Sequence, residues 1–216
     1  MPYYKNKNTN ILFIHIPKTG GSSIENYFSR KFNIPLDEKS LKSTNHSNSN
    51  KEKYKILPKN IPLQHLTYTS ILRFRRFFQI KRRNLKIITA VRNPYERLVS
   101  DLFFLNKINK NTPKKNIYQI ILNFIKENPE NHALPQHRFI INYHTRRIPR
   151  NITILKTEKL TEEMVQLGYN DFNLYQNKNK VNNVNYYDYL NKKSIQLINF
   201  YYHLDFILFH YNKIHM

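Results

Sequence analysis

Short, continuous apolar runs punctuate an otherwise polar chain. Two of them, at residues 11–16 and 85–91, are rich in β-branched side chains, and a third lies at residues 151–155. Runs of this length and composition are typical of strands that are buried on both faces of a parallel sheet. Pro17 ends the first run and Arg92-Asn93-Pro94 follows the second. The pattern therefore predicts three strands of one sheet.

Apolar residues at helical spacing follow the first two predicted strands. Ile24, Tyr27, Phe28 and Phe32 lie at i, i+3, i+4 and i+8 and predict a helix. Ser22 or Ser23 would cap it.

The second helix would present Tyr95, Leu98, Val99 and Leu102 to the core. Asn93 is expected as its N-cap, Pro94 at its first position and Glu96 as the partner in a capping box. Further helices are expected over 63–78, 117–126, 157–167 (closed by Gly168) and from 192 to about 203.

Strands that alternate with helices predict an α/β fold with three layers, in which helices flank a central parallel sheet. A chain of 216 residues suits one such domain, 1–216, with a single core. Residues 34–62 break the pattern, since 40–55 are nearly all Asn, Ser, Lys and His. This composition predicts a flexible insertion in the domain, at about 34–62, and residues 169–186 also read as loop.

The charge of the chain favours polyanionic partners. Lys and Arg total 36 against 14 Asp and Glu, which gives a formal net charge of +22. Nucleic acid, acidic membranes and acidic polysaccharides all fit this charge, and a biased amino-acid composition would account for part of it. The absence of cysteine excludes disulfides and thiolate metal sites. No apolar run is long enough for a transmembrane segment or signal peptide, so a cytoplasmic protein is expected.

Two motifs offer chemistry for binding anions. The first is Lys18-Thr19-Gly20-Gly21-Ser22-Ser23, which holds two of the three glycines of the chain. Backbone N–H groups of such a turn, with the positive end of the helix that follows, form an anion site, and Lys18 adds a charge. In the second motif, Arg92 ends a predicted strand and Ser100 lies about two turns along the next helix. Open α/β sheets hold ligands at the carboxyl ends of their strands.

The glycine turn differs from the P-loop of nucleoside triphosphatases, because Lys18 precedes the glycine pair instead of following it. No acidic residue is placed for magnesium after the second strand. An anion site without a metal is therefore expected. His65 stands between the two motifs at the start of a predicted helix, where a lone histidine is more often a solvated or capping residue.

The two motifs together resemble those of sulfotransferases that use 3′-phosphoadenosine 5′-phosphosulfate (PAPS). Pro17-Lys18-Thr19-Gly20-Gly21-Ser22-Ser23 is similar to their 5′-phosphosulfate loop, and Arg92 to Ser100 is similar to their 3′-phosphate motif, in which the Arg and the Ser hold that phosphate. The resemblance is to the Golgi carbohydrate sulfotransferases, and Gln64-His65-Leu66 resembles the position of the catalytic base in the heparan and dermatan 2-O-sulfotransferases. It implies the P-loop-like sulfotransferase fold.

The resemblance also implies a reaction: attack by a hydroxyl of a glycan on the sulfur of PAPS, with adenosine 3′,5′-bisphosphate as the leaving product. His65 would be the general base, and Lys18 would stabilise charge on the leaving group. Glu25 and His137 are alternative bases. The basic segments 73–83 and 107–115 would bind an anionic glycan or are simply solvated. A kinase with a degenerate phosphate loop and a non-enzymatic nucleic-acid-binding protein remain alternatives, the latter disfavoured because recognition motifs are missing. The oligomeric state is left open.

Overall fold

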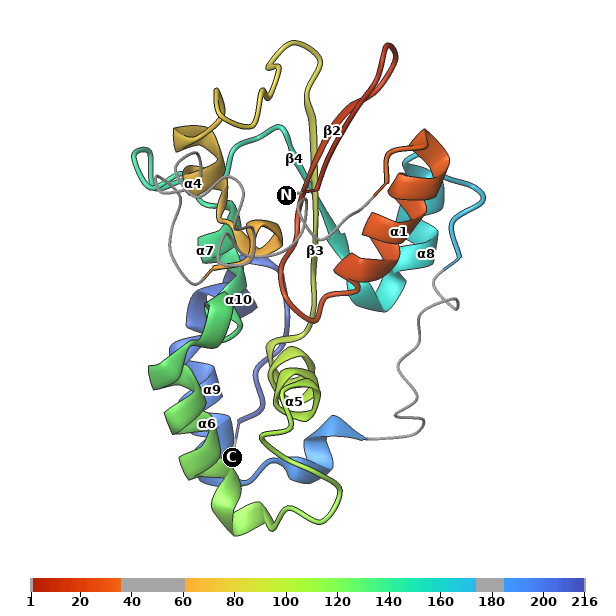
Figure 1. Ribbon diagram of the computed structural model, residues 1–216. Coiled ribbons are helices and arrows are strands. Elements are labelled where there is room, and N and C mark those ends of the chain that lie inside the picture. The colour runs from red at the N-terminus through yellow and green to blue at the C-terminus, as the bar shows by residue number, and fades with distance from the viewer. Residues whose placement is uncertain (1, 36–60, 174–184, 216) are drawn as a thin grey trace, which may run out of the picture.

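The fold is built on a four-stranded sheet. A computed structural model describes residues 2–35, 61–173 and 185–215. The strands are β1 (Tyr3–Lys5), β2 (Asn10–Ile14), β3 (Lys86–Val91) and β4 (Ile152–Lys156), paired in that order. The strands β2, β3 and β4 run parallel, whereas β1 pairs antiparallel with β2 (Figure 1). The three predicted strands are confirmed.

The strand β1 was not predicted, because its surroundings in the sequence are polar and basic. It is a three-residue edge strand in which Tyr4 is buried and Lys5 is exposed. Short edges that carry charge are common in natural sheets, since they discourage pairing with another chain. The sheet is therefore mixed, although mostly parallel.

Helices lie on both faces of the sheet and extend beyond the carboxyl ends of its parallel strands (Figure 1). The α-helices are α1 (Gly21–Phe32), α4 (Tyr68–Arg73), α5 (Pro94–Phe104), α6 (Ile117–Glu127), α7 (Gln136–Ile140), α8 (Leu160–Gln166), α9 (Lys192–Tyr201) and α10 (His203–Leu208). Short 3₁₀ turns cover Leu63–His65, Lys114–Asn116, Pro129–Asn131, Thr157–Lys159 and Tyr186–Tyr189.

The alternation of side chains along the strands explains the layers. Ile11 and Phe13 of β2 pack with α1 and α8, while Leu12 and Ile14 pack with α4 and α7 on the opposite face. Both faces of the central strands are thus covered, which is why their sequences are continuously apolar. The α/β, three-layer prediction is confirmed in this form.

The buried apolar residues of the described parts of the chain form three clusters. One cluster fills each face of the sheet, and the third joins α5, α6, α9 and α10 beyond the strand ends. Tyr95, Ile121 and Ile198 lie fully buried in this third cluster. This third cluster holds α5 in place, and α5 carries Ser100 of the second motif.

The helix predicted over 63–78 is wrong as a continuous element. It is split into the 3₁₀ turn Leu63–His65 and the short α4, separated by an extended Leu66. The cause is Thr67, whose hydroxyl accepts the backbone N–H of Ser70 at 3.3 Å and so begins a new helix. Residues after Arg73 continue only as turns.

Two predicted helix caps also need correction. Neither Ser22 nor Ser23 caps α1, because Gly20 occupies the N-cap in a left-handed conformation, with φ +80° and no side-chain bond. Asn93 does cap α5, accepting the N–H of Tyr95 at 3.0 Å, but no capping box forms with Glu96. The side chain of Glu158 takes the N–H of Asn93 instead. The predicted insertion at 34–62 lies mostly outside the described residues, as does most of the predicted 169–186 loop.

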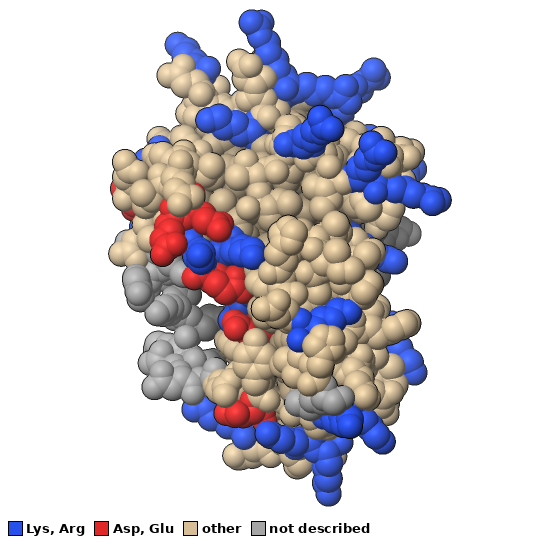
Figure 2. Space-filling view, turned by 180° about the vertical axis from the view of Figure 1, so that it is seen from behind, with Lys and Arg blue, Asp and Glu red and all other residues tan. Residues whose placement is uncertain are grey.

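Basic side chains gather at the end of the sheet that is opposite to Arg92. Figure 2 shows Lys and Arg projecting from the upper end of the molecule, where the β1–β2 turn and the segment before β3 lie. The exposed basic residues there are Lys5, Lys7, Lys81, Arg82, Arg83 and Lys86. Among the described residues, no helix combines the length and the apolar character needed to cross a membrane.

Candidate active site

The turn between β2 and α1 presents unpaired backbone donors. Lys18 and Gly20 both have positive φ, at 63° and 80°, so the chain reverses tightly before α1 begins. Within the described residues, the backbone N–H groups of Gly20, Gly21 and Ser22 meet no protein acceptor. They stand at the positive end of a twelve-residue helix. This is the arrangement that binds phosphate and related anions in proteins.

Neighbouring elements hold this turn in place. The hydroxyl of Thr19 donates to the carbonyl of Ile16 at 2.9 Å, and that of Thr157 donates to the carbonyl of Thr19 at 2.7 Å. Arg97 of α5 donates from Nε to the carbonyl of Pro17 at 3.0 Å. The carbonyls of Ile16, Pro17 and Thr19 therefore point into the protein, and the N–H groups of Gly20, Gly21 and Ser22 stay free of partners in the described part of the chain.

The ammonium group of Lys18 lies over the ring of Phe104, 4.0 Å from its centroid. Burial lowers the pKa of Lys18, with the charge of Arg92 acting in the same direction, while the carboxylate of Asp101 opposes both. The two predicted anion-binding motifs are thus near enough to influence each other. An anion bound next to Lys18 would stabilise its charged form and so offset the effect of burial on its pKa.

His15 lies directly against the glycine turn. Its Nδ1 bonds to Oε1 of Glu25 at 2.8 Å, and both side chains are buried. Its ring also contacts His65 edge-on, with centroids 5.4 Å apart. His15 therefore joins the predicted base to the predicted phosphosulfate loop.

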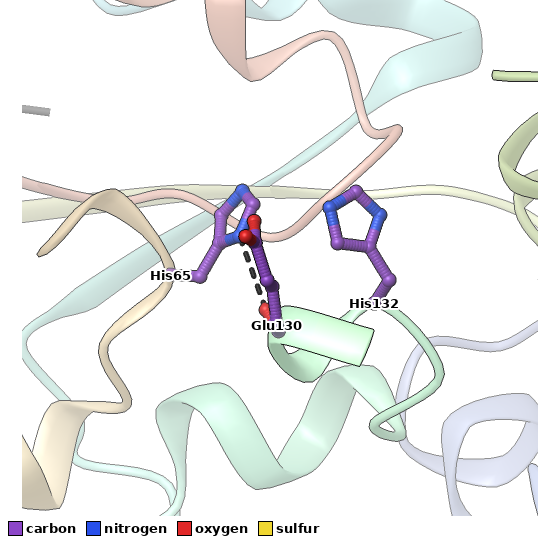
Figure 3. A group of neighbouring side chains, drawn as sticks. All are labelled: His65, Glu130 and His132. Atoms are coloured by element: carbon purple, nitrogen blue, oxygen red, sulfur yellow. Dashed lines mark hydrogen bonds between the residues drawn. The ribbon is translucent and has the colours of Figure 1, made fainter. Parts of the chain in front are cut away.

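Among the described residues, one ring nitrogen of His65 is bonded and the other meets no hydrogen-bond partner. Its Nδ1 lies 3.1 Å from the backbone carbonyl of Glu130 (Figure 3). Because a carbonyl only accepts, Nδ1 carries the proton and Nε2 keeps its lone pair. Burial, together with the nearby His15, His132 and Arg97, holds the pKa of His65 well below its usual value, against the opposing bond from Glu130. The imidazole is accordingly neutral, as a general base requires.

His132 extends this row of rings on the other side of His65. The two ring centroids are 4.9 Å apart and nearly perpendicular. Nδ1 of His132 bonds to Oδ1 of Asp101 at 2.6 Å, and its ring stacks on Phe104 with centroids 6.0 Å apart. Phe104 in turn lies under Lys18. A continuous arc of side chains therefore runs from Gly21 through three histidines and Phe104 back to Lys18.

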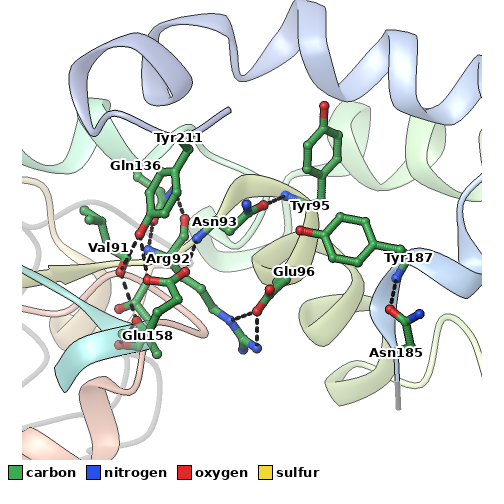
Figure 4. A network of polar contacts seen from close by, with 12 residues as sticks. Val91, Arg92, Asn93, Tyr95, Glu96, Gln136, Glu158, Asn185, Tyr187 and Tyr211 are labelled. Atoms are coloured by element: carbon green, nitrogen blue, oxygen red, sulfur yellow. Dashed lines mark hydrogen bonds and ion pairs between the residues drawn. The ribbon is translucent and has the colours of Figure 1, made fainter. Parts of the chain in front are cut away.

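The backbone of Arg92 is fixed by a network at the end of β3 (Figure 4). The amide of Gln136 bonds both to its N–H, at 2.9 Å, and to its carbonyl, at 2.8 Å. The guanidinium pairs with Glu96 at 3.1 Å and lies 5.0 Å from the ring centroid of Tyr186. Arg92 is thus held at the carboxyl edge of the sheet, with its charge engaged by a carboxylate.

Ser100 is almost completely buried on α5, and no bond to its hydroxyl is seen among the described residues. The alternative bases predicted from the sequence are engaged elsewhere. Glu25 is bonded to His15, and Nδ1 of His137 bonds to Asp205 at 2.7 Å.

The amino-acid sequence was also compared with known proteins. A family model described as "Sulfotransferase family" matches residues 2–212, which is nearly the whole chain. The chain belongs to the sulfotransferase family. No curated protein and no solved structure matches it significantly. Membership supports the transfer of sulfuryl groups, for which the family generally uses PAPS as the donor.

Four residues of this sulfotransferase site were missed by the sequence analysis: His15, Arg97, Asp101 and His132. His15 stands in the quoted strand-to-turn stretch, where a polar residue at the end of an apolar run is a signal that could have been used. Arg97 and Asp101 are buried on α5, although charged residues are mostly found at the surface, so only the structure shows that they face inward.

Proposed function

We propose that this sulfotransferase transfers a sulfuryl group from PAPS to a hydroxyl of a carbohydrate, as the Golgi carbohydrate and 2-O-sulfotransferases do. The observation that carries the proposal is the free set of N–H donors at Gly20, Gly21 and Ser22 beside Lys18. Donors and charge of this kind fit a phosphosulfate, and they lie in contact with a row of histidines that contains a neutral base.

Each residue of the site has a proposed role. Lys18 and the turn Thr19–Ser23 hold the 5′-phosphosulfate and stabilise the charge that develops on the leaving phosphate oxygen. Arg92 and Ser100 hold the 3′-phosphate, for which the guanidinium must exchange its partner Glu96 for the ligand.

His65 takes the proton. PAPS supplies the sulfuryl group: the acceptor oxygen bonds to sulfur, the bond from sulfur to the phosphate oxygen breaks, and adenosine 3′,5′-bisphosphate leaves with that electron pair. Nε2 of His65 accepts the hydroxyl proton, while the carbonyl of Glu130 keeps the ring in the required tautomer. No metal ion is needed for these roles.

Of the two basic segments, 107–115 is the better candidate for an anionic glycan. The ring of Phe104 contacts Lys18, and Lys107 lies three residues after Phe104 in the sequence. Lys110, Lys114 and Lys115 of the same segment are exposed. The other basic segment, 73–83, precedes β3 and therefore lies at the opposite end of that strand from Arg92. Six residues at about 3.3 Å each put about 20 Å between the two ends of β3.

Calorimetry with three ligands tests the proposed function. Adenosine 3′,5′-bisphosphate should bind, whereas ATP with magnesium would be preferred by a kinase and a random oligonucleotide by a nucleic-acid-binding protein. Lys18→Ala should weaken bisphosphate binding, and Lys126→Ala, an exposed lysine on α6, serves as the matched control. Failure of the bisphosphate to bind, or equal binding by both variants, would overturn the proposal.

A further inference from the structure

Three side chains, one of which is the proposed base, converge on one point. One ligand atom from each of His65, Glu130 and His132 lies within 4.8 Å of the others. Figure 3 shows a ring nitrogen of His132 turned toward His65, and the carboxylate of Glu130 at the ring of His65. A tetrahedral Zn²⁺ with bonds of about 2.0–2.1 Å needs ligands about 3.3 Å apart, so the three ligand atoms would draw together by up to about 1.5 Å on binding.

Both histidines are prepared as metal ligands. Nδ1 of His65 donates to a backbone carbonyl, and Nδ1 of His132 donates to the buried carboxylate of Asp101. Metal-bound histidines in proteins usually donate their second N–H in one of these two ways, which fixes the ring and leaves Nε2 for the ion. Both imidazoles are buried, so little water competes for them.

Glu130 supplies the carboxylate. Its side chain is exposed and bonds to no other protein group within the described residues, while its backbone is held with φ +48°. The turn that carries Glu130 forms two hydrogen bonds with His65. The Glu130 carbonyl accepts from Nδ1 of His65, and Nδ2 of Asn131 donates to the His65 carbonyl at 3.3 Å. The carboxylate is therefore both free and tethered beside the two rings.

We propose that His65, Glu130 and His132 bind a divalent transition-metal ion, with Zn²⁺ as the best fit to two imidazoles and one carboxylate. The ion occupies the Nε2 lone pair of His65. The same lone pair cannot also accept a proton from an acceptor hydroxyl, so the ion acts as a reversible inhibitor of sulfuryl transfer. The inhibition rests on the proposed function, whereas the binding itself does not.

Calorimetry on the full chain without a histidine tag, after treatment with a chelator, tests the binding. One Zn²⁺ per chain is expected, with Mg²⁺ bound far more weakly. Glu130→Gln should weaken Zn²⁺ binding at least about 10-fold, because an exposed ligand is lost without disturbing the core. Glu127→Gln, which alters an exposed carboxylate three residues earlier, is the matched control and should bind like the parent chain. Equal affinity in the two variants, or no binding by the parent, would overturn the site.

An assay of sulfuryl transfer under increasing Zn²⁺ tests the consequence. Inhibition should follow the binding curve, be reversed by chelator and shift in Glu130→Gln by the same factor as the affinity. Zinc that binds without inhibiting would overturn the inhibitory role. Zinc that binds to a chain unable to bind adenosine 3′,5′-bisphosphate would overturn the proposed function and leave the metal site standing.

Discussion

Gly21 packs directly against the imidazole ring of His15 in the candidate active site. A Cβ atom placed on Gly21 would lie 2.6 Å from both Cδ2 and Nε2 of the His15 ring, closer than real contacts allow. Gly21 has no positive φ, so its need for glycine comes from this ring and not from its backbone conformation. The glycine turn and the row of histidines are therefore one packed unit.

Gly21→Ala should destabilise the protein and weaken adenosine 3′,5′-bisphosphate binding together. Alanine favours a helix over glycine, so any loss reflects displacement of His15. We expect a cost of about 1–3 kcal/mol, typical of overpacking, measured by urea unfolding and calorimetry. Gly168→Ala is the control: its Cβ meets open space, although φ +88° strains it. Bisphosphate binding that falls equally in both variants would show that the fit of His15 is not the cause.

Arg97 is expected to support the site through the backbone. Its guanidinium is buried and donates to the carbonyls of Pro17, His132 and Leu134 at 2.7–3.0 Å. The single ammonium group of lysine lacks the planar fork of donors with which Arg97 reaches three separate carbonyls. Arg97→Lys should therefore cost about 2–4 kcal/mol in unfolding free energy and weaken bisphosphate binding. Arg83→Lys, at an exposed position, should change neither. Unfolding midpoints that coincide for the two variants would contradict this role.

The sequence predicted the parts of this fold in which local pattern and burial agree. Continuous apolar runs identified β2, β3 and β4, and the Asn-Pro pair located the start of α5 within one residue. It failed in two other places. The local cap of Thr67 divides a helix that periodicity alone would continue. A tertiary contact decides the second case, since Glu158, distant in sequence, takes the N–H of Asn93 that Glu96 was expected to bind.

The candidate site divides in the same way. Lys18, the glycine turn and Arg92 were found because their motifs are contiguous in sequence. The partners of His65 were not, since Glu130 and His132 come from a turn some 65 residues away, and only folding brings them together. Periodicity carries no information about contacts of that range.

Arg92 should determine recognition of the 3′-phosphate. Adenosine 3′,5′-bisphosphate should bind more tightly than adenosine 5′-monophosphate, and Arg92→Ala should remove about 10–100-fold of that preference, the value of a charge-assisted hydrogen bond. Glu96→Gln should instead tighten bisphosphate binding, because it frees the guanidinium from its ion pair. Calorimetry with both nucleotides measures each effect. If Arg92→Ala weakens the two nucleotides equally, Arg92 does not read the 3′-phosphate.

The two basic segments should differ in their contribution to acceptor binding. Replacing Lys110, Lys114 and Lys115 with Gln removes three exposed charges from the segment that follows α5, and replacing Lys81, Arg82 and Arg83 with Gln removes three from the segment before β3. With a heparin-derived acceptor, the first triple variant should raise KM several-fold and the second should not. Both should lose affinity for heparin resin, since net charge alone affects it. A larger KM effect from the second triple variant would place the acceptor elsewhere.

His65→Ala should abolish transfer without loss of the nucleotide. Its Nε2 is the available basic atom of a neutral ring, whereas Glu25 and His137 are bonded to His15 and Asp205. Loss of a general base lowers kcat by about 10²–10⁴-fold. Affinity for adenosine 3′,5′-bisphosphate should remain close to that of the parent chain, because His15 lies between His65 and the glycine turn in the described part of the chain. His144→Ala, an exposed histidine, should transfer normally. Unchanged kcat in His65→Ala would assign the base to another residue, and a parallel loss of bisphosphate affinity would make His65 part of the nucleotide site instead.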